Sequence, residues 1–256
     1  MSIKEMKAGN LKVKIFSTRQ LMGQAAAKEA SVSIKKLLIQ KGEINIVFAA
    51  APSQNEFLDG LANDKGIDWS RINAFHMDEY IGLDPKAPQG FGNFLRDRLF
   101  GKVPFKSVNY LDGASKDIKA ECRRYSQLLK ANPTNIVCMG IGENGHIAFN
   151  DPHVARFDDS ELVKVVELDA KCRQQQVNDG CFKSFDEVPT HALTLTIPAL
   201  TSCSCIFCIV PAKTKAEAIY NTINGEVSEK CPATILKTHN NAILYVDADS
   251  GSLVLV

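Results

Sequence analysis

The amino-acid sequence predicts an α/β protein with a doubly wound, mainly parallel sheet (Rossmann-like) flanked by helices. Short apolar runs alternate along the chain with longer segments that have helical spacing, which is typical of this class. Several of the runs end in polar loops with glycines and ionisable side chains, as expected where the carboxyl edge of a sheet forms a ligand site. Neither an internal repeat nor a low-complexity linker divides the chain, so we expect one domain over residues 1–256.

Strands are predicted where a short apolar or alternating run is bounded by glycine, proline or polar residues. These runs cover residues 11–16 (as an edge strand), 44–50, 69–77, 136–139, 163–168, 190–197, 205–210 and 242–246. Helices are predicted where apolar residues recur every three or four positions. These segments are residues 19–40, a helix starting near residue 52 with Ser53 as its N-cap, 91–100, 117–132 and 213–222; Gly42 ends the first and Pro133 follows the fourth.

Composition excludes several functional classes. The chain has 30 basic and 29 acidic residues and a net charge of +1, so no overall field favours nucleic acid or an acidic membrane. No apolar run approaches the ~20 residues that span a bilayer, and the polar N-terminus lacks the core of a secretory signal. We therefore expect a cytoplasmic protein. Most of the 8 cysteines lie in apolar runs, which indicates buried thiols rather than metal ligands or disulfides.

The loop after residues 136–139 has the strongest chemical signal. It contains Gly140, Gly142 and Gly145, then His146 and Asp151. Glycine lets backbone N–H groups approach a ligand, and a histidine beside a carboxylate is a common proton-transfer pair. A structural histidine bonded to a backbone carbonyl is the alternative interpretation, and the neighbouring glycines and carboxylate favour catalysis.

A second acidic pair, Asp78 and Glu79, directly follows the predicted strand 69–77. Acidic pairs in loops are most often solvated surface groups. Their place at a strand end instead favours a site, because the carboxyl ends of parallel strands meet at one edge of a sheet.

Four blocks of sequence together resemble the glucosamine-6-phosphate deaminase (isomerase) family, within the wider group that includes 6-phosphogluconolactonase. The blocks are residues 77–83, 145–150, 191–197 and the pair 215–218 with 232–236. They occur in the family's order and span about residues 45 to 247, which is far more specific than any one short motif.

This resemblance implies roles for the ionisable residues. Asp78 would be the base that moves a proton between C2 and C1 of the sugar, and His146 would open the pyranose ring by shuttling a proton to O5. Asp151 would orient the imidazole and tune its charge. The chain departs from the best-known deaminases with Asn144 in place of an aspartate and Asp151 in place of a glutamate. We expect Asn144 to accept a hydrogen bond through its amide oxygen and Glu143 to restore the missing charge.

The resemblance also implies a phosphate subsite. Residues 49–55 stand where the family has a glycine-rich phosphate loop, so Ser53 and the backbone near Ala51 would hold phosphate at a helix N-terminus. Lys215, with Lys213 as the near alternative, and Arg173 are the candidate cations. Glu79 and Gly145 complete the predicted substrate contacts. The alternatives are an ordinary strand-to-helix turn and solvated surface cations.

The implied activity converts glucosamine 6-phosphate and water to fructose 6-phosphate and ammonia without a cofactor or a metal. A 6-phosphogluconolactonase is the nearest alternative, but Tyr80 and Phe149 stand where its typical blocks have arginine and serine. A deaminase acting on galactosamine 6-phosphate and a sugar-phosphate sensor without turnover also stay open. The expected partner is a small amino-sugar phosphate, and a homo-oligomer is compatible with the sequence.

Overall fold

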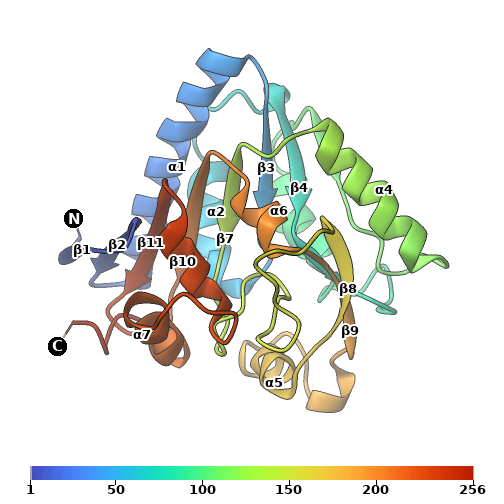
Figure 1. The fold of residues 1–256 in the computed structure, drawn as a ribbon. Coiled ribbons are helices and arrows are strands. Elements are labelled where there is room, and N and C mark those ends of the chain that lie inside the picture. The colour runs from blue at the N-terminus through green and yellow to red at the C-terminus, as the bar shows by residue number, and fades with distance from the viewer. Residues whose placement is uncertain (1, 256) are drawn as a thin grey trace.

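The computed structural model describes residues 2–255 and is built on an eight-stranded sheet in the order β1-β2-β11-β10-β7-β3-β4-β6 (Figure 1). Only β1 pairs in the antiparallel direction, with β2, and the other neighbours are parallel. The strands are β1 (Lys4–Ala8), β2 (Leu11–Phe16), β3 (Ile44–Phe48), β4 (Ile72–His76), β6 (Ser107–Asn109), β7 (Ile136–Met139), β10 (Cys205–Val210) and β11 (Ala242–Asp247). The predicted mainly parallel sheet is confirmed.

Helices cover both faces of this sheet, because its central strands are apolar on both sides. Successive residues of β3 illustrate the alternation: Phe48 packs into one apolar cluster and Val47 into the other. The first cluster includes buried side chains of α1 (Arg19–Lys41), α2 (Asn55–Ala62) and α3 (Phe91–Leu95), and the second those of α4 (Ile118–Ala131), α6 (Ile197–Thr201) and α7 (Ala216–Asn224). The fold is therefore doubly wound, as predicted.

A second, three-stranded antiparallel sheet lies beside the carboxyl edge of the first (Figure 1). Its order is β5 (Asp78–Tyr80), β9 (His191–Leu195) and β8 (Val163–Glu167). The predicted strands at 163–168 and 190–197 form here rather than in the main sheet. Only Met77 separates β4 from β5, so the chain changes sheets at that point and places Asp78 at the junction.

Several local predictions need correction. The N-terminal strand β1 was not predicted. Because β1 pairs with β2, β2 lies inside the sheet and not at its edge as expected. Ser53 is not an N-cap: it lies within a 3₁₀ turn at Pro52–Gln54, and no side chain caps that turn or α2. The predicted helix at 91–100 is α3 followed by a π-helical turn at Arg96–Phe100. The short helix α5 (Ala170–Asn178) was also missed.

Short 3₁₀ turns complete the architecture, and they lie at Trp69–Arg71, Phe185–Glu187, Lys213–Lys215 and Pro232–Thr238. The predicted stop at Gly42 is confirmed, since this residue has φ 77° and its N–H donates to Leu38 O at 3.0 Å. Over residues 2–255, no helix combines the length and apolar character needed to cross a membrane.

Candidate active site

A cavity at the carboxyl ends of β3, β4 and β7 brings together five of the residues predicted from the sequence. Its lining includes Ala51, Ser53, Asp78, His146 and Lys215. These residues come from distant parts of the chain, and they meet because parallel strands end at the same edge of the sheet. The acid from the first loop and the imidazole from the second therefore share one cavity.

Asp78 lies where the chain leaves the main sheet, and the whole residue is 6% exposed. Burial raises the pKa of this carboxyl well above its ordinary value, and the nearby charge of Glu79 raises the pKa further. An aspartate that takes up a proton this readily at a cavity wall suits a group that must accept and return a proton.

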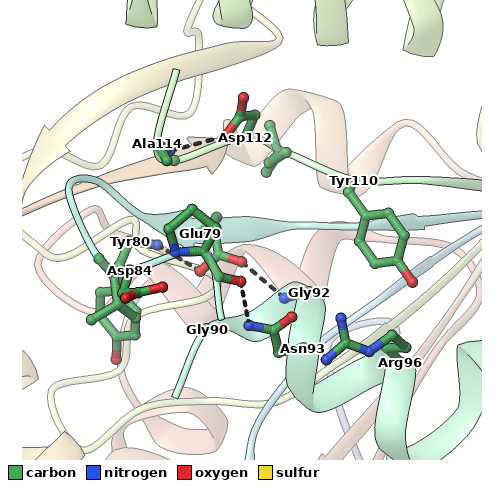
Figure 2. Close-up of a pocket in the computed structure, with 14 residues that line it drawn as sticks. Glu79, Tyr80, Asp84, Gly90, Gly92, Asn93, Arg96, Tyr110, Asp112 and Ala114 are labelled. Atoms are coloured by element: carbon green, nitrogen blue, oxygen red, sulfur yellow. Dashed lines mark hydrogen bonds between the residues drawn. The ribbon is translucent and has the colours of Figure 1, made fainter. Parts of the chain in front are cut away.

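Glu79 does not line the cavity with Asp78, although it was predicted to contact substrate. Its carboxylate accepts hydrogen bonds from the backbone N–H groups of Tyr80 (2.9 Å), Phe91 (3.0 Å) and Gly92 (2.8 Å), and Figure 2 shows those from Tyr80 and Gly92. Two of these N–H groups belong to the first turn of α3, where backbone N–H groups have no acceptor within the helix, so Glu79 supplies the missing hydrogen-bond acceptor. The carboxylate borders a separate hollow, which it shares with Arg96 and Tyr110 (Figure 2).

His146 lies flat against the backbone of Gly142. A Cβ on Gly142 would lie 2.1 Å from Cε1 and 2.2 Å from Nε2 of the ring, so only glycine leaves room for the imidazole. Gly145 is needed for a different reason, because its φ is 83° and a Cβ there would lie 2.6 Å from Cys231 Sγ. Gly145 shapes the loop but is not part of the cavity lining.

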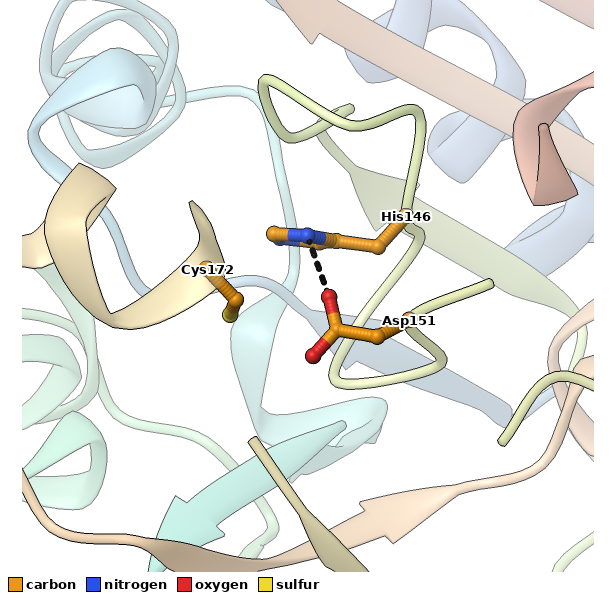
Figure 3. A group of neighbouring side chains, drawn as sticks. All are labelled: His146, Asp151 and Cys172. Carbon is orange, nitrogen blue, oxygen red and sulfur yellow. Dashed lines mark ion pairs between the residues drawn. The ribbon is translucent and has the colours of Figure 1, made fainter. Parts of the chain in front are cut away.

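A network of hydrogen bonds fixes the proton of His146. Its Nδ1 lies 3.0 Å from Asp151 Oδ1 (Figure 3) and 2.7 Å from Asn144 Oδ1. The Nδ2 of Asn144 donates to Asp151 Oδ1 at 2.9 Å and to Asp169 Oδ2 at 2.8 Å. Flipping this amide would place its oxygen against two carboxylates, so its oxygen faces His146 Nδ1. Because an amide oxygen only accepts, Nδ1 carries the proton and Nε2 is left for a ligand.

Asp169 was missed by sequence reasoning. It caps the N-terminus of α5, since its Oδ1 accepts from Cys172 N–H at 2.6 Å, and its own N–H donates to Asp151 Oδ2 at 3.2 Å. Burial opposes ionisation of the fully buried Asp151, but bonds from His146, Asn144 and Asp169 N–H outweigh it and lower the pKa of Asp151. The carboxylate of Asp169, not that of Glu143, is thus the second acidic group of the network that orients His146.

The carboxylate of Glu143 faces Lys215. The Nζ of Lys215 is 3.8 Å from Glu143 Oε1 and 4.0 Å from Asp179 Oδ2, and the whole residue is 4% exposed. Burial lowers the pKa of Lys215, while Asp179 and Glu143 oppose that shift. The predicted role of Glu143 beside His146 is therefore not supported by its position.

Arg173 is also placed away from the cavity. Its guanidinium stacks on the Phe185 ring at 4.0 Å and donates to the carbonyl oxygens of Phe185 and Val188. The face of α5 that lines the cavity instead presents Gln175 and Gln176, with Asp179 just beyond the helix. Ser53 does line the cavity, and its Oγ accepts from Gln54 Nε2 at 3.1 Å.

Two groups of side chains have ligand atoms close enough to consider for a metal ion. His146, Asp151 and Cys172 form one group (Figure 3), and Asp151, His153 and Asp169 the other. In both, the carboxylate oxygens of Asp151 already accept hydrogen bonds within the network. Burial, followed by the charge of Asp151, raises the pKa of the Cys172 thiol well above its ordinary value, which disfavours the thiolate that a metal requires. Neither group is arranged as a ready metal site.

Comparisons with known proteins place the chain in a family. The model of the family described as glucosamine-6-phosphate isomerases/6-phosphogluconolactonase matches residues 17–245, and the chain belongs to this family. A curated glucosamine-6-phosphate deaminase from Bacillus cereus (strain B4264) is 34% identical over 187 residues, which are 73% of this chain and 70% of the relative. The deaminase of Bacillus cytotoxicus is 32% identical over 220 residues, covering 86% and 82%.

Solved structures agree with this assignment. A structure described as a monomeric glucosamine-6-phosphate deaminase, a missing link of the NagB superfamily, superposes with a TM-score of 0.85 at 30% identity, covering 97% of this chain and all 100% of that one. The 6-phosphogluconolactonase of Thermotoga maritima has a TM-score of 0.75 at 19% identity, covering 93% and 99%, and shares the fold.

The network around Asp151 predicts a pH-dependent contribution to stability. Its pKa is lower in the folded chain than in the unfolded chain, so its contribution is present above the unfolded pKa of about 3.9 and is lost as the pH falls below it. Asp151→Asn should lower the free energy of unfolding by about 1–3 kcal/mol at pH 7. The difference from wild type should shrink below about pH 4, as measured by urea unfolding from pH 7 to 3.

The exposed Asp186 provides the matched control, and Asp186→Asn should change stability by less than about 0.5 kcal/mol at every pH. A deficit in Asp151→Asn that stays constant down to pH 3 would contradict the assigned network.

The contact between Gly142 and the imidazole predicts a coupling between two positions. Gly142→Ala should lower the free energy of unfolding by about 1–3 kcal/mol, because the new methyl group overlaps the ring of His146. In a His146→Ala background the same change should cost far less, since the ring is absent. Urea unfolding of the four proteins measures this coupling.

Gly140→Ala is the control, since a Cβ there lies no closer than 3.3 Å to its neighbours and its cost should be the same with or without His146. Equal costs of Gly142→Ala in both backgrounds would show that the ring does not lie on Gly142.

Proposed function

We propose that this protein is a glucosamine-6-phosphate deaminase, an enzyme that converts glucosamine 6-phosphate and water to fructose 6-phosphate and ammonia. The observation that carries the proposal is the shared cavity of Asp78 and His146, with the buried ammonium of Lys215 in its wall. The activity that the curated relatives are named for supports the substrate.

Ring opening is the first chemical step, and His146 fits it. Because Nδ1 holds its proton between Asn144 and Asp151, Nε2 can take the proton of the O1 hydroxyl and pass it to the ring oxygen O5, as the C1–O5 bond breaks and the C1=O1 double bond forms. The carboxylate of Asp151 stabilises the imidazolium that forms when Nε2 is protonated. This step gives the open-chain aldehyde.

Proton transfer between C2 and C1 follows, and Asp78 fits the role of the base. It removes the C2 proton, which the adjacent C1 carbonyl acidifies, and the O1 oxygen takes up a proton from solvent to give an enolamine. The protonated carboxyl of Asp78 then delivers its proton to C1. The raised pKa of Asp78 brings its carboxyl closer to the acidity of such a carbon acid than an exposed aspartate would be. Water adds to the resulting imine carbon at C2, and ammonia leaves to give the ketone.

The Ser53 and Lys215 side chains fit the phosphate end of the substrate, because both line the same cavity as the two catalytic groups. We place this enzyme in the cytoplasm. All 8 cysteines are free thiols within the described chain, an arrangement that persists where the compartment is reducing.

The proposal predicts the effect of removing the base. Asp78→Asn should abolish exchange of the C2 hydrogen with solvent and reduce ammonia release by about 10²–10⁴-fold, because the amide cannot take up the proton. Binding of glucosamine 6-phosphate should change little, as measured by calorimetry. The measurements are deuterium incorporation at C2 and a coupled ammonia assay.

The exposed Asp84, which borders the neighbouring hollow, is the control, and Asp84→Asn should retain activity. Parallel assays with galactosamine 6-phosphate and with 6-phosphogluconolactone test the other two enzyme functions. Unchanged C2 exchange in Asp78→Asn would refute the assignment of the base, and tight binding of the sugar phosphate by wild type without turnover would favour a sensor.

A further inference from the structure

Lys215 has an unusual environment for a residue that faces an anion. Its Nζ is buried and makes no hydrogen bond to any group of residues 2–255. The two nearest acceptors are carboxylate oxygens of Glu143 and Asp179, at 3.8 and 4.0 Å, which is beyond hydrogen-bond range. Oε1 of Glu143 is also buried and lacks a hydrogen-bond partner among these residues, so an ammonium donor and a carboxylate oxygen are both left unsatisfied next to each other.

These two acids are held in place by Gln175. The Oε1 of Gln175 accepts from the backbone N–H of Glu143 at 2.8 Å, and its Nε2 donates to Asp179 Oδ2 at 3.3 Å. Gln175 and Asp179 line the cavity together with Lys215. Lys215 and the carboxylate of Asp179 are therefore part of the cavity wall, and Glu143 adds a second carboxylate near Lys215 without lining the cavity.

The charges of this subsite do not match a fully ionised phosphate. The other titratable groups that face it are Cys172, which contributes to the environment of Lys215, and Asp78 and His146 across the cavity. Apart from His146, Lys215 is the one basic side chain among the described residues that line the cavity. A phosphate dianion would satisfy Lys215 but would place unprotonated oxygens against the carboxylates, where like charges repel.

A phosphate group that carries one proton fits better. Its bare oxygens accept from the ammonium of Lys215, and its P–OH donates to a carboxylate, which is a strong charge-assisted hydrogen bond. We propose that Asp179 and Glu143 are specificity-determining residues that make the Lys215 end of the cavity select a singly protonated phosphate group. This inference rests on the proposed function only in placing the substrate's phosphate at Lys215.

Methyl phosphate, a phosphate monoester, and sulfate are the probes that test this selection. A phosphate monoester has its second pKa at about 6, so its singly protonated form becomes about tenfold scarcer with each pH unit above 7. Sulfate has a similar shape but carries no proton at these pH values. Isothermal calorimetry on the wild-type protein should show a Kd for methyl phosphate that rises about tenfold per pH unit between pH 7 and 8.5. At pH 7 we expect sulfate to bind at least about tenfold more weakly than methyl phosphate.

The variants Asp179→Asn and Glu143→Gln remove a negative charge and replace an acceptor with a side chain that can donate. Each should strengthen sulfate binding by about tenfold and flatten the pH dependence of methyl phosphate binding. Asp186→Asn, which alters an exposed acid outside the cavity, should leave both anions unaffected. Lys215→Ala should weaken the binding of both anions.

Three results would overturn the inference: equal binding of sulfate and methyl phosphate by the wild type at pH 7, weaker sulfate binding in both charge-removing variants, or no binding of either anion. The wild-type comparison does not depend on any variant folding. An ammonia assay separates this inference from the proposed function. Selective binding of methyl phosphate without deamination would refute the proposed function and keep the inference. Deamination that is inhibited equally by sulfate and methyl phosphate would support the proposed function and refute the inference.

Discussion

The hydrogen bond between the amide oxygen of Asn144 and Nδ1 of His146 is the interaction on which the chemistry of this cavity depends. An amide can present either its oxygen or its NH₂ group to an imidazole. Here the carboxylates of Asp151 and Asp169 accept from the NH₂ group, so the oxygen must face His146. The chain therefore has a neutral side chain at position 144 and still fixes the tautomer of His146. The charge that stabilises an imidazolium comes from Asp151, which contacts Nδ1 directly.

Backbone geometry brings this imidazole opposite the candidate base. Gly142 gives the ring a surface to lie on, and the change of sheet between β4 and β5 directs Asp78 toward the cavity and Glu79 away from it. Adjacent residues of a strand point to opposite sides, so the two members of an acidic pair at this position have different roles. Asp78 faces the ligand space, and Glu79 holds the start of α3.

Much of the main sheet could be predicted because β3, β7, β10 and β11 are continuous apolar runs bounded by polar residues. The second sheet could not, since the patterns of β8 and β9 fit a strand in either sheet and β5 is only 3 residues long. The short edge partner β1 was missed because it has few apolar residues. In each case the pairing of strands distant in sequence, and not local preference, decides the structure.

The candidate site shows the same division. His146 and Asp78 could be assigned to one cavity because each follows a recognisable strand, and Lys215 could be added because its sequence block resembles that of the family. Asp169, Gln175 and Asp179 lie on or beside α5, a polar helix with a weak periodic signal. If that helix is recognised, residues 172, 175, 176 and 179 share one face by their spacing, and Arg173 falls outside it.

The protonation of His146 tests this account most directly. In uniformly ¹⁵N-labelled protein, the ring nitrogen shifts of His146 report which nitrogen carries the proton in the neutral state. We expect Nδ1 to be the protonated nitrogen. The variant Asp169→Asn removes a carboxylate that accepts from the NH₂ group of Asn144, so it should weaken the preference for a proton on Nδ1. A neutral ring protonated at Nε2 in the wild-type protein would contradict the account, because the nitrogen facing the cavity could then not accept a proton from the sugar.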